Sequence, residues 1–446
     1  MSALGAPTGA SAPSSLSAPA KFYTTSFHKQ MPDQVFTIPT TALPAALSEI
    51  INTMLALDPP IPFDFLIGEE YVMTTLDKFM RRRGLSTEEI MHIEYTPALQ
   101  AKEGNKLPHD DWVASVRAPF NGDANFLITG SYDNCVRVWS GEECLAVGAG
   151  HSEAVKEVAF HPVPVDMPSE VKKAGKKRAQ SEVGSNVAFA SASMDGSVRT
   201  WVYDATTSKI KATGVIRQNI GAVDTVTISP DGRLLACGSW DKTVKVFDWS
   251  VAVDTVADPM KKQPIASLSD HARSVLSVRF SPSQRNVLYS TGLDGSVKIW
   301  DAQNAQLMGT LAGEHAVQSL TVKPASNSAD YLLTGCTDNK IRMYDTRQKG
   351  AVKTFSGHRQ WVYGVTWMWR EEEQGGAPAG ENLFASSSED ATVRVWDLRC
   401  VSAPLMVKDM LHTDGVLDVT YCGKNEVASC GKDNRTKSFS VEKNFE

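Results

Sequence analysis

The sequence predicts a mainly β protein: a seven-bladed propeller that follows a small α+β domain. Three observations support this prediction. A short pattern recurs seven times between residues 131 and 440, and each copy holds a tight turn followed by alternating apolar residues. Such alternation is typical of strands with one buried face. The first hundred residues lack the pattern and combine strand-like runs with an amphipathic helix.

Each copy of the repeat has a small residue, a variable residue, an Asp, two further residues, and apolar positions that close on an aromatic residue. The copies run from SYDNCVRVW (131–139) to GKDNRTKSFS (431–440). Their turn aspartates lie 43–62 residues apart and are Asp133, Asp195, Asp241, Asp294, Asp338, Asp390 and Asp433. Repeats of about 40–45 residues ending in Trp-Asp are the signature of a WD-repeat propeller, in which each copy forms one blade. The sequence therefore predicts a propeller over residues 109–446.

A histidine precedes most copies, four residues before the first apolar residue of a strand. In WD-repeat proteins this His forms a hydrogen-bonded network with a strand Ser, the turn Asp and the Trp. The predicted networks are His151, Ser193, Asp195 and Trp201 in blade 2, and His358, Ser388, Asp390 and Trp396 in blade 6. Ser, His and Asp also make up hydrolase triads. A catalytic triad occurs once, whereas this set recurs around the ring, so we predict structural networks, no catalytic residue and no enzyme.

Two blades depart from the pattern. Asn219 replaces the His in blade 3, and blade 5 reads AGEHAVQSL, one residue short of the usual spacing. The networks of these two blades are therefore in question.

The end of the chain raises the question of ring closure. The last copy stops soon after Phe439, which leaves little chain for an outer strand in blade 7. The linker at 98–108, or a segment such as Tyr95–Lys106, could pair with this blade and protect its edge.

Three long spacings predict surface insertions, at 161–186, 251–263 and 370–381. The first contains the basic cluster KKAGKKR (172–178), which fits a nuclear-localisation or RNA-contacting patch, or a merely solvated loop.

The N-terminal region divides in two. Residues 1–20 are rich in Ala, Ser, Pro and Gly, which predicts a disordered tail. Residues 21–97 predict a ubiquitin-like β-grasp: two strands from KFYTTSF and QVFTIP, a helix over 46–57, and later strands at 63–67 and 91–96. The chain continues past this domain without a di-glycine end. We therefore predict a built-in recognition domain rather than a conjugated modifier.

A turn near the end of this domain holds two neighbouring glutamates. Ser86 and Glu89 fit a capping box, in which Ser86 accepts a backbone hydrogen bond and Glu89 reaches back. This interpretation leaves Glu88 without a local role on an exposed turn.

Composition excludes several classes of protein. The formal net charge of −6 lacks the basic excess of a dedicated nucleic-acid binder. The seven cysteines never form Cys-x-x-Cys, which favours reduced thiols over a disulfide framework or zinc site. No apolar run is long enough to cross a membrane, the N-terminus does not read as a secretory signal, and no phosphate-binding Gly-rich loop is present.

The combination of PFDFLI, GLS-x-E and IEY with HDDW at the start of the propeller resembles a specific family. It is similar to the eukaryotic WD-repeat ribosome-biogenesis factors of the PeBoW complex, beside pescadillo and the block-of-proliferation protein. The resemblance implies a role in pre-rRNA processing and maturation of the large (60S) ribosomal subunit, on pre-60S particles in the nucleolus and nucleoplasm. It also implies that the propeller binds the block-of-proliferation protein and, through it, pescadillo.

The resemblance further implies a second partner for the ubiquitin-like domain, the AAA ATPase midasin. Midasin grips this domain through a Mg²⁺-dependent adhesion site, in which an acidic ligand side chain completes the metal coordination. The family's metal-reaching Glu in GLS-x-E corresponds to Glu88. Mg²⁺ prefers hard oxygen ligands, including carboxylates. The ion belongs to midasin, and we expect no cofactor held by this chain itself.

For the propeller, the residue before each turn Asp should lie near the top face. In the first four blades these residues are large and apolar: Tyr132, Met194, Trp240 and Leu293. Such residues often anchor interfaces, so we predict a partner surface here. Packing against neighbouring loops is the alternative.

Three other functions are consistent with parts of the sequence. A notchless-like factor would share both domain types but carry eight repeats. A ubiquitin-ligase substrate adaptor would need a module such as an F-box, which the N-terminal domain does not resemble. Direct RNA contact, which the sequence leaves open, depends on KKAGKKR and on RRR (81–83).

Overall fold

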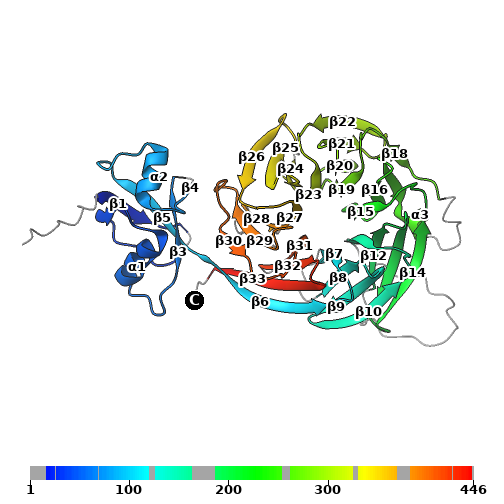
Figure 1. The fold of residues 1–446 in the computed structure, drawn as a ribbon, viewed down its shortest axis with the longest axis horizontal. Coiled ribbons are helices and arrows are strands. Elements are labelled where there is room, and N and C mark those ends of the chain that lie inside the picture. Colours follow the sequence, from blue (N-terminus) through cyan, green and yellow to red (C-terminus); the bar gives the residue numbers. More distant parts are fainter. Residues whose placement is uncertain are drawn as a thin grey trace, which may run out of the picture. The chain divides into compact units, whose positions relative to one another are not determined.

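The structure is a computed structural model, in which the chain forms two compact units, residues 1–100 with 442–446 and residues 101–441 (Figure 1). It describes residues 17–25, 27–68, 70–119, 126–162, 186–253, 262–324, 330–368, 382–423 and 425–443.

The first unit is a five-stranded sheet with two helices. The strand order is β2-β1-β5-β3-β4, and the central strands β1 and β5 run parallel while the other pairs are antiparallel. This is the arrangement of a β-grasp. Its elements are β1 (Ser17–Tyr23), β2 (Phe36–Pro39), α1 (Pro44–Leu55), β3 (Phe63–Ile67), β4 (Glu70–Tyr71), α2 (Leu76–Arg83) and β5 (Met91–Pro97).

This unit has a core of its own. Helix α1 begins at a proline, which suits the first helical turn, and turns Leu47 and Ile51 onto the sheet. These side chains pack with Phe22, Phe63 and Phe65. The first strand begins at Ser17, inside the segment 1–20 expected as a tail, because residues of that segment are themselves buried in this core.

The second unit is a ring of seven four-stranded antiparallel sheets. The innermost strand of each blade contacts that of the next, and β31 contacts β7 to close the ring (Figure 1). The predicted fold class is therefore confirmed.

The strands follow one another blade by blade along the chain. Blades 1 and 2 are β7 (Val113–Arg117), β8 (Phe126–Ser131), β9 (Cys135–Ser140), β10 (Glu143–Ala149), and β11 (Val155–Phe160), β12 (Val187–Ser193), β13 (Val198–Asp204), β14 (Lys209–Ile216). Blades 3 and 4 are β15 (Val223–Ile228), β16 (Leu234–Ser239), β17 (Val244–Asp248), β18 (Ala266–Leu268), and β19 (Val275–Phe280), β20 (Val287–Gly292), β21 (Val297–Asp301), β22 (Gln306–Leu311). Blades 5 and 6 are β23 (Val317–Pro324), β24 (Asp330–Cys336), β25 (Lys340–Asp345), β26 (Ala351–Ser356), and β27 (Val362–Trp367), β28 (Leu383–Ser388), β29 (Val393–Asp397), β30 (Met406–Lys408). Blade 7 has β31 (Val416–Gly423), β32 (Glu426–Gly431) and β33 (Arg435–Lys443).

Blade 7 takes its fourth strand from the other end of the chain. Strand β6 (Leu99–Pro108) lies beside β33 as the outer strand of this blade (Figure 1). The Asn105 amide donates to Ser438 Oγ at 2.9 Å, and Leu107 is buried in the core between blades 7 and 1. The residues expected as a linker thus form a strand that covers an edge otherwise free to pair with another chain.

Most of the three expected insertions lies outside the described residues, including the basic cluster at 172–178. In the second, the short helix α3 (Trp249–Ala252) follows β17 directly. It is capped by Asp248, whose Oδ1 accepts from the Ser250 amide at 2.8 Å.

Four charged side chains from separate blades meet at the inner strands. Arg117 of blade 1 pairs with Glu157 of blade 2 and with Asp418 of blade 7. Arg279 of blade 4 reaches the same Glu157 at 2.6 Å. The Glu157 and Asp418 carboxylates also accept the Val226 and Val116 amides of the next blades, each at 3.1 Å. The blades are therefore joined by polar contacts as well as by apolar packing.

Candidate interaction surfaces

The Ser, His and Asp side chains form a closed network in blade 2. His151 Nδ1 donates to Asp195 Oδ2 at 3.0 Å, and its Nε2 lies 2.7 Å from Ser191 Oγ. The same hydroxyl accepts from Trp201 Nε1 at 2.8 Å. The prediction of Ser193 was wrong in this respect. Ser193 lies at the end of β12, where its hydroxyl bonds the Glu153 carbonyl and the Asp195 amide at the turn.

Blade 6 has the same network, and its serine again lies two residues before the one predicted. Ser386 lies 2.7 Å from His358 Nε2 and accepts from Trp396 Nε1 at 2.8 Å. Ser388, the predicted member, instead bonds the turn backbone. His358 Nδ1 reaches Asp390 at 3.0 Å. Blades 4 and 7 have equivalent His–Ser contacts.

The two blades with unusual sequences lack this network. In blade 3, Lys245 Nζ donates to Asn219 Oδ1 at 3.1 Å and to Asp241 at 3.0 Å, in place of a His–Asp contact. In blade 5, Asp338 is bound by Arg342, and His315 Nε2 stays 3.8 Å away.

Burial favours the neutral form of His151 and His358, whereas hydrogen bonds favour the charged form of Asp195. Burial lowers the pKa of His151 and of His358, against the effect of their Asp partners. Burial by itself raises the pKa of Asp195, but hydrogen bonds from His151 and Ser197 outweigh it and hold this pKa well below its usual range. Because the hydroxyl of Ser191 is fully buried and already bonded to His151 and Trp201, the set is suited to structure rather than to nucleophilic attack.

The top face of the propeller follows a regular backbone pattern. In each blade, the amide of the residue before the turn Asp donates to the carbonyl of the residue before the inner strand, as in Trp240 to Ala222 at 2.9 Å. Of the four predicted partner-binding residues, Trp240 and Leu293 are exposed, whereas Tyr132 and Met194 are half-buried.

Two of these four residues belong to a polar chain that crosses blades 1, 2 and 3. Lys156 Nζ donates to Tyr132 Oη at 2.9 Å, and Trp240 Nε1 donates to Asp224 Oδ2 at 2.5 Å. The other oxygen, Asp224 Oδ1, is buried and has no partner among the described residues. Burial raises the pKa of Asp224, although Lys156 opposes this shift. Because this oxygen is buried, a partner cannot reach it directly, whereas the exposed Trp240 indole beside it is accessible and suits contact with a cationic side chain.

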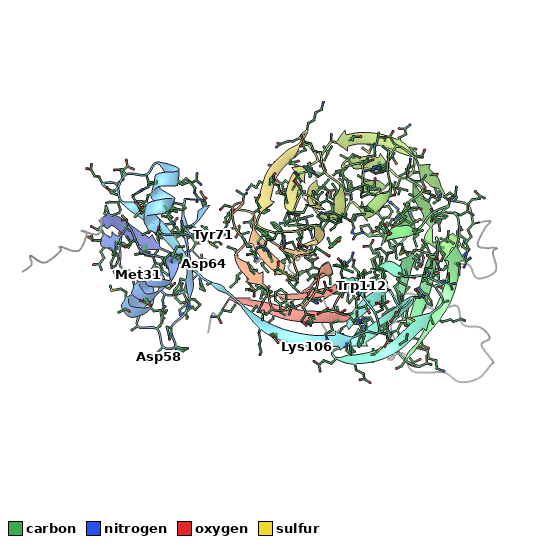
Figure 2. All side chains as sticks on the ribbon, in the orientation of Figure 1. Met31, Asp58, Asp64, Tyr71, Lys106 and Trp112 are labelled. Atoms are coloured by element: carbon green, nitrogen blue, oxygen red, sulfur yellow. The ribbon has the colours of Figure 1, made fainter. Side chains whose placement is uncertain are left out.

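A second cluster on the same face, which was not predicted from the sequence, is formed by blades 1, 6 and 7. Trp112 packs edge-on against Tyr132, and Trp361 packs edge-on against Tyr363. Lys432 Nζ lies 5.3 Å from the Trp112 ring centre, and it pairs with Glu389 at 2.6 Å. Figure 2 labels Trp112 in the propeller. The available signal was HDDWV and HRQWV, because only these two blades carry Trp directly before the inner strand.

Glu88 lies on an irregular turn between α2 and β5. The capping-box prediction was wrong, because no helix follows Ser86, whose hydroxyl accepts from the Glu88 amide at 3.1 Å within the turn itself. Residues 81–90 are all exposed. Within the described part of the chain, the Glu88 carboxylate makes no hydrogen bond or ion pair, and the same holds for Glu89.

The neighbouring arginines are engaged in ion pairs. Arg81 pairs with Asp77 at 3.0 Å, and Arg82 and Arg83 both pair with Glu70. Their charge is therefore partly neutralised within the domain, which weakens the case for RRR as an RNA patch.

Neither a metal centre nor a membrane span is found in the described residues. There, no group of three or more His, Cys, Asp or Glu side chains is arranged to hold a metal ion. Nor does that part of the chain contain a helix long and apolar enough to span a bilayer.

Two domain families match the chain. The NLE (NUC135) domain matches residues 19–80. The WD domain, G-beta repeat, matches 102–140, 213–248, 262–301, 305–345 and 350–397. Among solved structures, the WD40 β-propeller domain of Doa1 superimposes with a TM-score of 0.56 at 18% identity, covering 77% of this chain and 98% of that one. At this identity the likeness shows the fold alone.

Full-length relatives share both parts of the chain. A protein of Drosophila persimilis named "Ribosome biogenesis protein WDR12 homolog" is 29% identical over 433 residues, 93% of each chain. Proteins of the same name from Nematostella vectensis and Chlamydomonas reinhardtii are also 29% identical; the matches cover 93% and 90% of this chain, and 97% and 90% of the relatives.

Proposed function

We propose that this chain, which its relatives and domains support as a WD-repeat ribosome-biogenesis factor, is a non-enzymatic assembly factor of the large ribosomal subunit. It acts in pre-rRNA processing on pre-60S particles, in the nucleolus and nucleoplasm. Its propeller holds the block-of-proliferation protein and, through it, pescadillo. Its ubiquitin-like domain is gripped by midasin, which releases it from the particle.

The observation that carries the proposal is the free carboxylate of Glu88. It lies on an exposed turn and makes no interaction in the described chain. A carboxylate already paired with Arg would have to break that pair before binding a metal. The nearby arginines are instead occupied by Asp77 and Glu70, so Glu88 is left available.

The chemistry of a shared metal suits this position. Mg²⁺ is usually held by one or two carboxylates and several waters, so a ligand from another protein can replace a water. Glu88 would supply that oxygen, and midasin would hold the ion. Force from the ATPase would then act on this domain. The alternative ligand, Glu89, is equally exposed and is therefore the natural control.

The test is binding of the full-length chain to the adhesion domain of midasin with Mg²⁺ present. We expect Glu88→Gln to weaken binding at least tenfold, because the amide keeps the shape but loses the charge, and Glu89→Gln to leave it unchanged. EDTA should abolish binding of the wild type. Equal binding by all three proteins would exclude the Glu88 contact.

For the propeller, the top face provides the surface for the block-of-proliferation protein. Its exposed aromatics, Trp112, Trp240 and Trp361, are 40%, 48% and 49% exposed, and residues of this kind dominate interface energies. The Trp240 indole is held at this face because its Nε1 donates to Asp224 Oδ2.

We expect Trp240→Ala to weaken binding of the block-of-proliferation protein at least tenfold, since it removes both an apolar contact and the donor to Asp224. Met308→Ala is the control: Met308 is exposed but lies on the outer strand β22, away from the top face. The measurement is a titration by calorimetry with folded variants. Unchanged affinity for Trp240→Ala would remove this residue from the interface.

A substrate adaptor of a ubiquitin ligase, or a notchless-like factor, is the second candidate. The shared NLE domain keeps the notchless-like alternative relevant. The described residues form seven blades rather than eight, which favours the first proposal. The test is to purify this protein with its bound partners. Complexes that contain ribosomal precursors but no ubiquitin-ligase subunit would further favour the assembly-factor proposal.

A further inference from the structure

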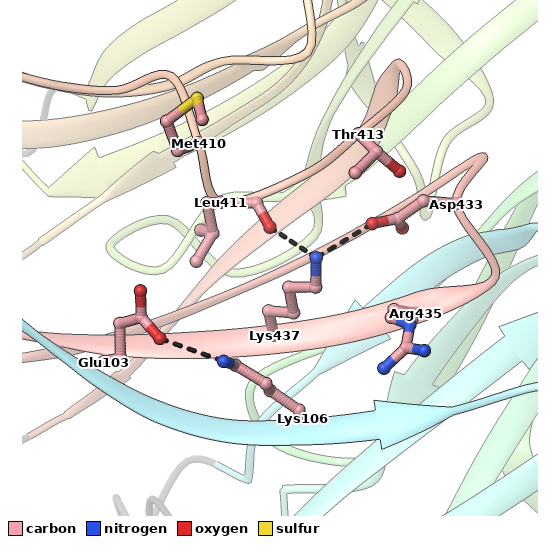
Figure 3. A pocket seen from close by; sticks show the side chains of 8 residues that line it. All are labelled: Glu103, Lys106, Met410, Leu411, Thr413, Asp433, Arg435 and Lys437. Atoms are coloured by element: carbon pink, nitrogen blue, oxygen red, sulfur yellow. Dashed lines mark hydrogen bonds and ion pairs between the residues drawn. The ribbon is translucent and has the colours of Figure 1, made fainter.

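A pocket of about 380 Å³ lies at the seam where the two ends of the propeller chain meet. Its volume is within the range of about 300–1,000 Å³ that is usual for ligand pockets. Figure 3 shows that β6, β33 and the loop before β31 each contribute to it. The lining residues are Glu103, Lys106, Met410, Leu411, Thr413, Asp433, Arg435 and Lys437.

The charges in this pocket do not balance. Lys106 pairs with Glu103 at 3.0 Å, and Lys437 pairs with Asp433 at 3.0 Å (Figure 3). Arg435 is exposed and makes no hydrogen bond or ion pair with the described part of the chain. One guanidinium is therefore left without a counter-charge, with its donors available to an incoming anion.

Arg435 also breaks the rule of the repeat. In blades 2, 3, 4 and 6 the residue two positions after the turn Asp is Ser or Thr, and its hydroxyl donates to that Asp at 2.6–2.8 Å. Blade 7 has Arg435 at this place. Cys135 and Lys340 stand at this place in blades 1 and 5, so three blades lack the contact, and blade 7 is the one in which the residue lines the pocket.

Met410 is the exposed apolar residue of this pocket. Two residues before the repeat His, blades 2, 4 and 6 carry the small residues Ala149, Ser269 and Ser356, whereas blade 1 carries Leu107, which is buried. Blade 7 has Met410, which is 90% exposed. A large apolar side chain in water is stabilised by burial, and Met adapts readily to different apolar partners.

We infer that this pocket binds a short acidic peptide, with a carboxylate on Arg435 and a neighbouring apolar side chain on Met410. A carboxylate matches the guanidinium in a two-pronged ion pair. A nucleic-acid backbone fits less well, because binding a run of phosphates depends on several cations, whereas Lys106 and Lys437 are already paired and leave one guanidinium for an anion. Neither Glu88 nor a top-face aromatic is among the lining residues.

The test uses the full-length chain and three fluorescein-labelled probes in anisotropy titrations. The first is an acetylated peptide with the core Leu-Glu-Glu-Leu, the second has Leu-Gln-Gln-Leu, and the third is oligouridylate. We expect the acidic peptide to bind at least tenfold more tightly than the amide peptide. Arg435→Ser should weaken it at least tenfold, and Met410→Ser severalfold.

Lys340→Ser is the matched control, since Lys340 occupies the position of Arg435 in blade 5 and is also exposed. It should leave peptide binding unchanged. Ser stands at this position in blades 2 and 4, so both variants should fold, which thermal melting checks. The inference is overturned if the two peptides bind equally, if the acidic peptide does not bind at millimolar concentration, or if both Ser variants act alike. If only oligouridylate binds, and its binding depends on Arg435, the pocket is a nucleic-acid site and the inference is also overturned.

Discussion

Ser191 and Ser193 lie two residues apart on one strand, yet only Ser191 joins His151 to Trp201. A strand turns both side chains to the same face, so alternation alone cannot separate them. The choice depends on the pairing of β12 with β13, in which Ser191 faces Arg199 and Phe189 faces Trp201. The sequence could therefore predict that a network exists, but not which serine completes it.

This difference has a consequence for stability. Ser191→Ala leaves the buried Trp201 indole N–H and His151 Nε2 without partners, and each such loss costs about 1–3 kcal/mol. We expect the free energy of unfolding to fall by about 2–4 kcal/mol in urea titrations. Ser193→Ala, which removes only contacts to the turn backbone, should cost about 1 kcal/mol. Equal losses for the two variants would contradict the assignment.

Glu88 illustrates a different limit of sequence reasoning. The local pattern suggested a helix start, whereas the chain forms an open turn. That the Glu88 side chain is unpaired depends on where Asp77 and Glu70 hold the arginines, which is a matter of tertiary structure.

At the scale of the element, a buried or half-buried histidine bonds a strand hydroxyl in blades 1, 2, 4, 6 and 7. Burial lowers the pKa of His109 to about 4, with a further contribution from Arg137. It also lowers the pKa of His151, His271 and His358. In the unfolded chain these groups titrate near a pKa of about 6.5. Below that pH the unfolded state binds more protons, so protonation favours unfolding.

We therefore expect the free energy of unfolding to fall as the pH is lowered from about 6.5 to about 4. The measurement is urea unfolding at several pH values. His109→Gln should reduce the slope in this window, because one of the linked protons is removed. The control is His92→Gln, whose side chain is exposed on β5 of the other unit and should leave the slope unchanged. A slope that His109→Gln does not change would contradict the role of His109.

Strand β6 is an element whose presence could be predicted from the sequence but whose register could not. The sequence predicted that a segment before the propeller could pair with blade 7, and the structure shows that β6 takes this place. In the observed register, Gly104 lies so close to Ser438 that an added Cβ would collide with the serine hydroxyl. This close approach explains a glycine in the middle of a strand, where glycine is otherwise unfavourable.

At the scale of the whole molecule, ring closure brings together groups that no local pattern connects. Arg117 and Asp418 are 301 residues apart in sequence, and Arg279 and Glu157 are 122 apart. The repeat predicts where each inner strand lies, and so predicts the ring. The charged contacts depend on which side chain stands at one position in each blade, and only the closed ring shows which of them meet.

Glu157 is the centre of this cluster, because it binds arginines from blades 1 and 4 and the backbone of blade 3. Burial raises its pKa, but Arg279 and Arg117 outweigh this effect and keep it charged. Removing one partner from a buried ion cluster leaves the others uncompensated, which costs about 3–5 kcal/mol.

We expect Glu157→Gln to lower the free energy of unfolding by about 3–5 kcal/mol in urea titrations, whereas Glu153→Gln, in the exposed loop of the same blade, should change it by less than about 0.5 kcal/mol. Adding Arg279→Gln to Glu157→Gln should cost less than the sum of the two single changes, since the second removes a cation that has already lost its partner. Strict additivity would mean that Glu157 and Arg279 are not energetically coupled, and that apolar packing between neighbouring inner strands closes the ring without them.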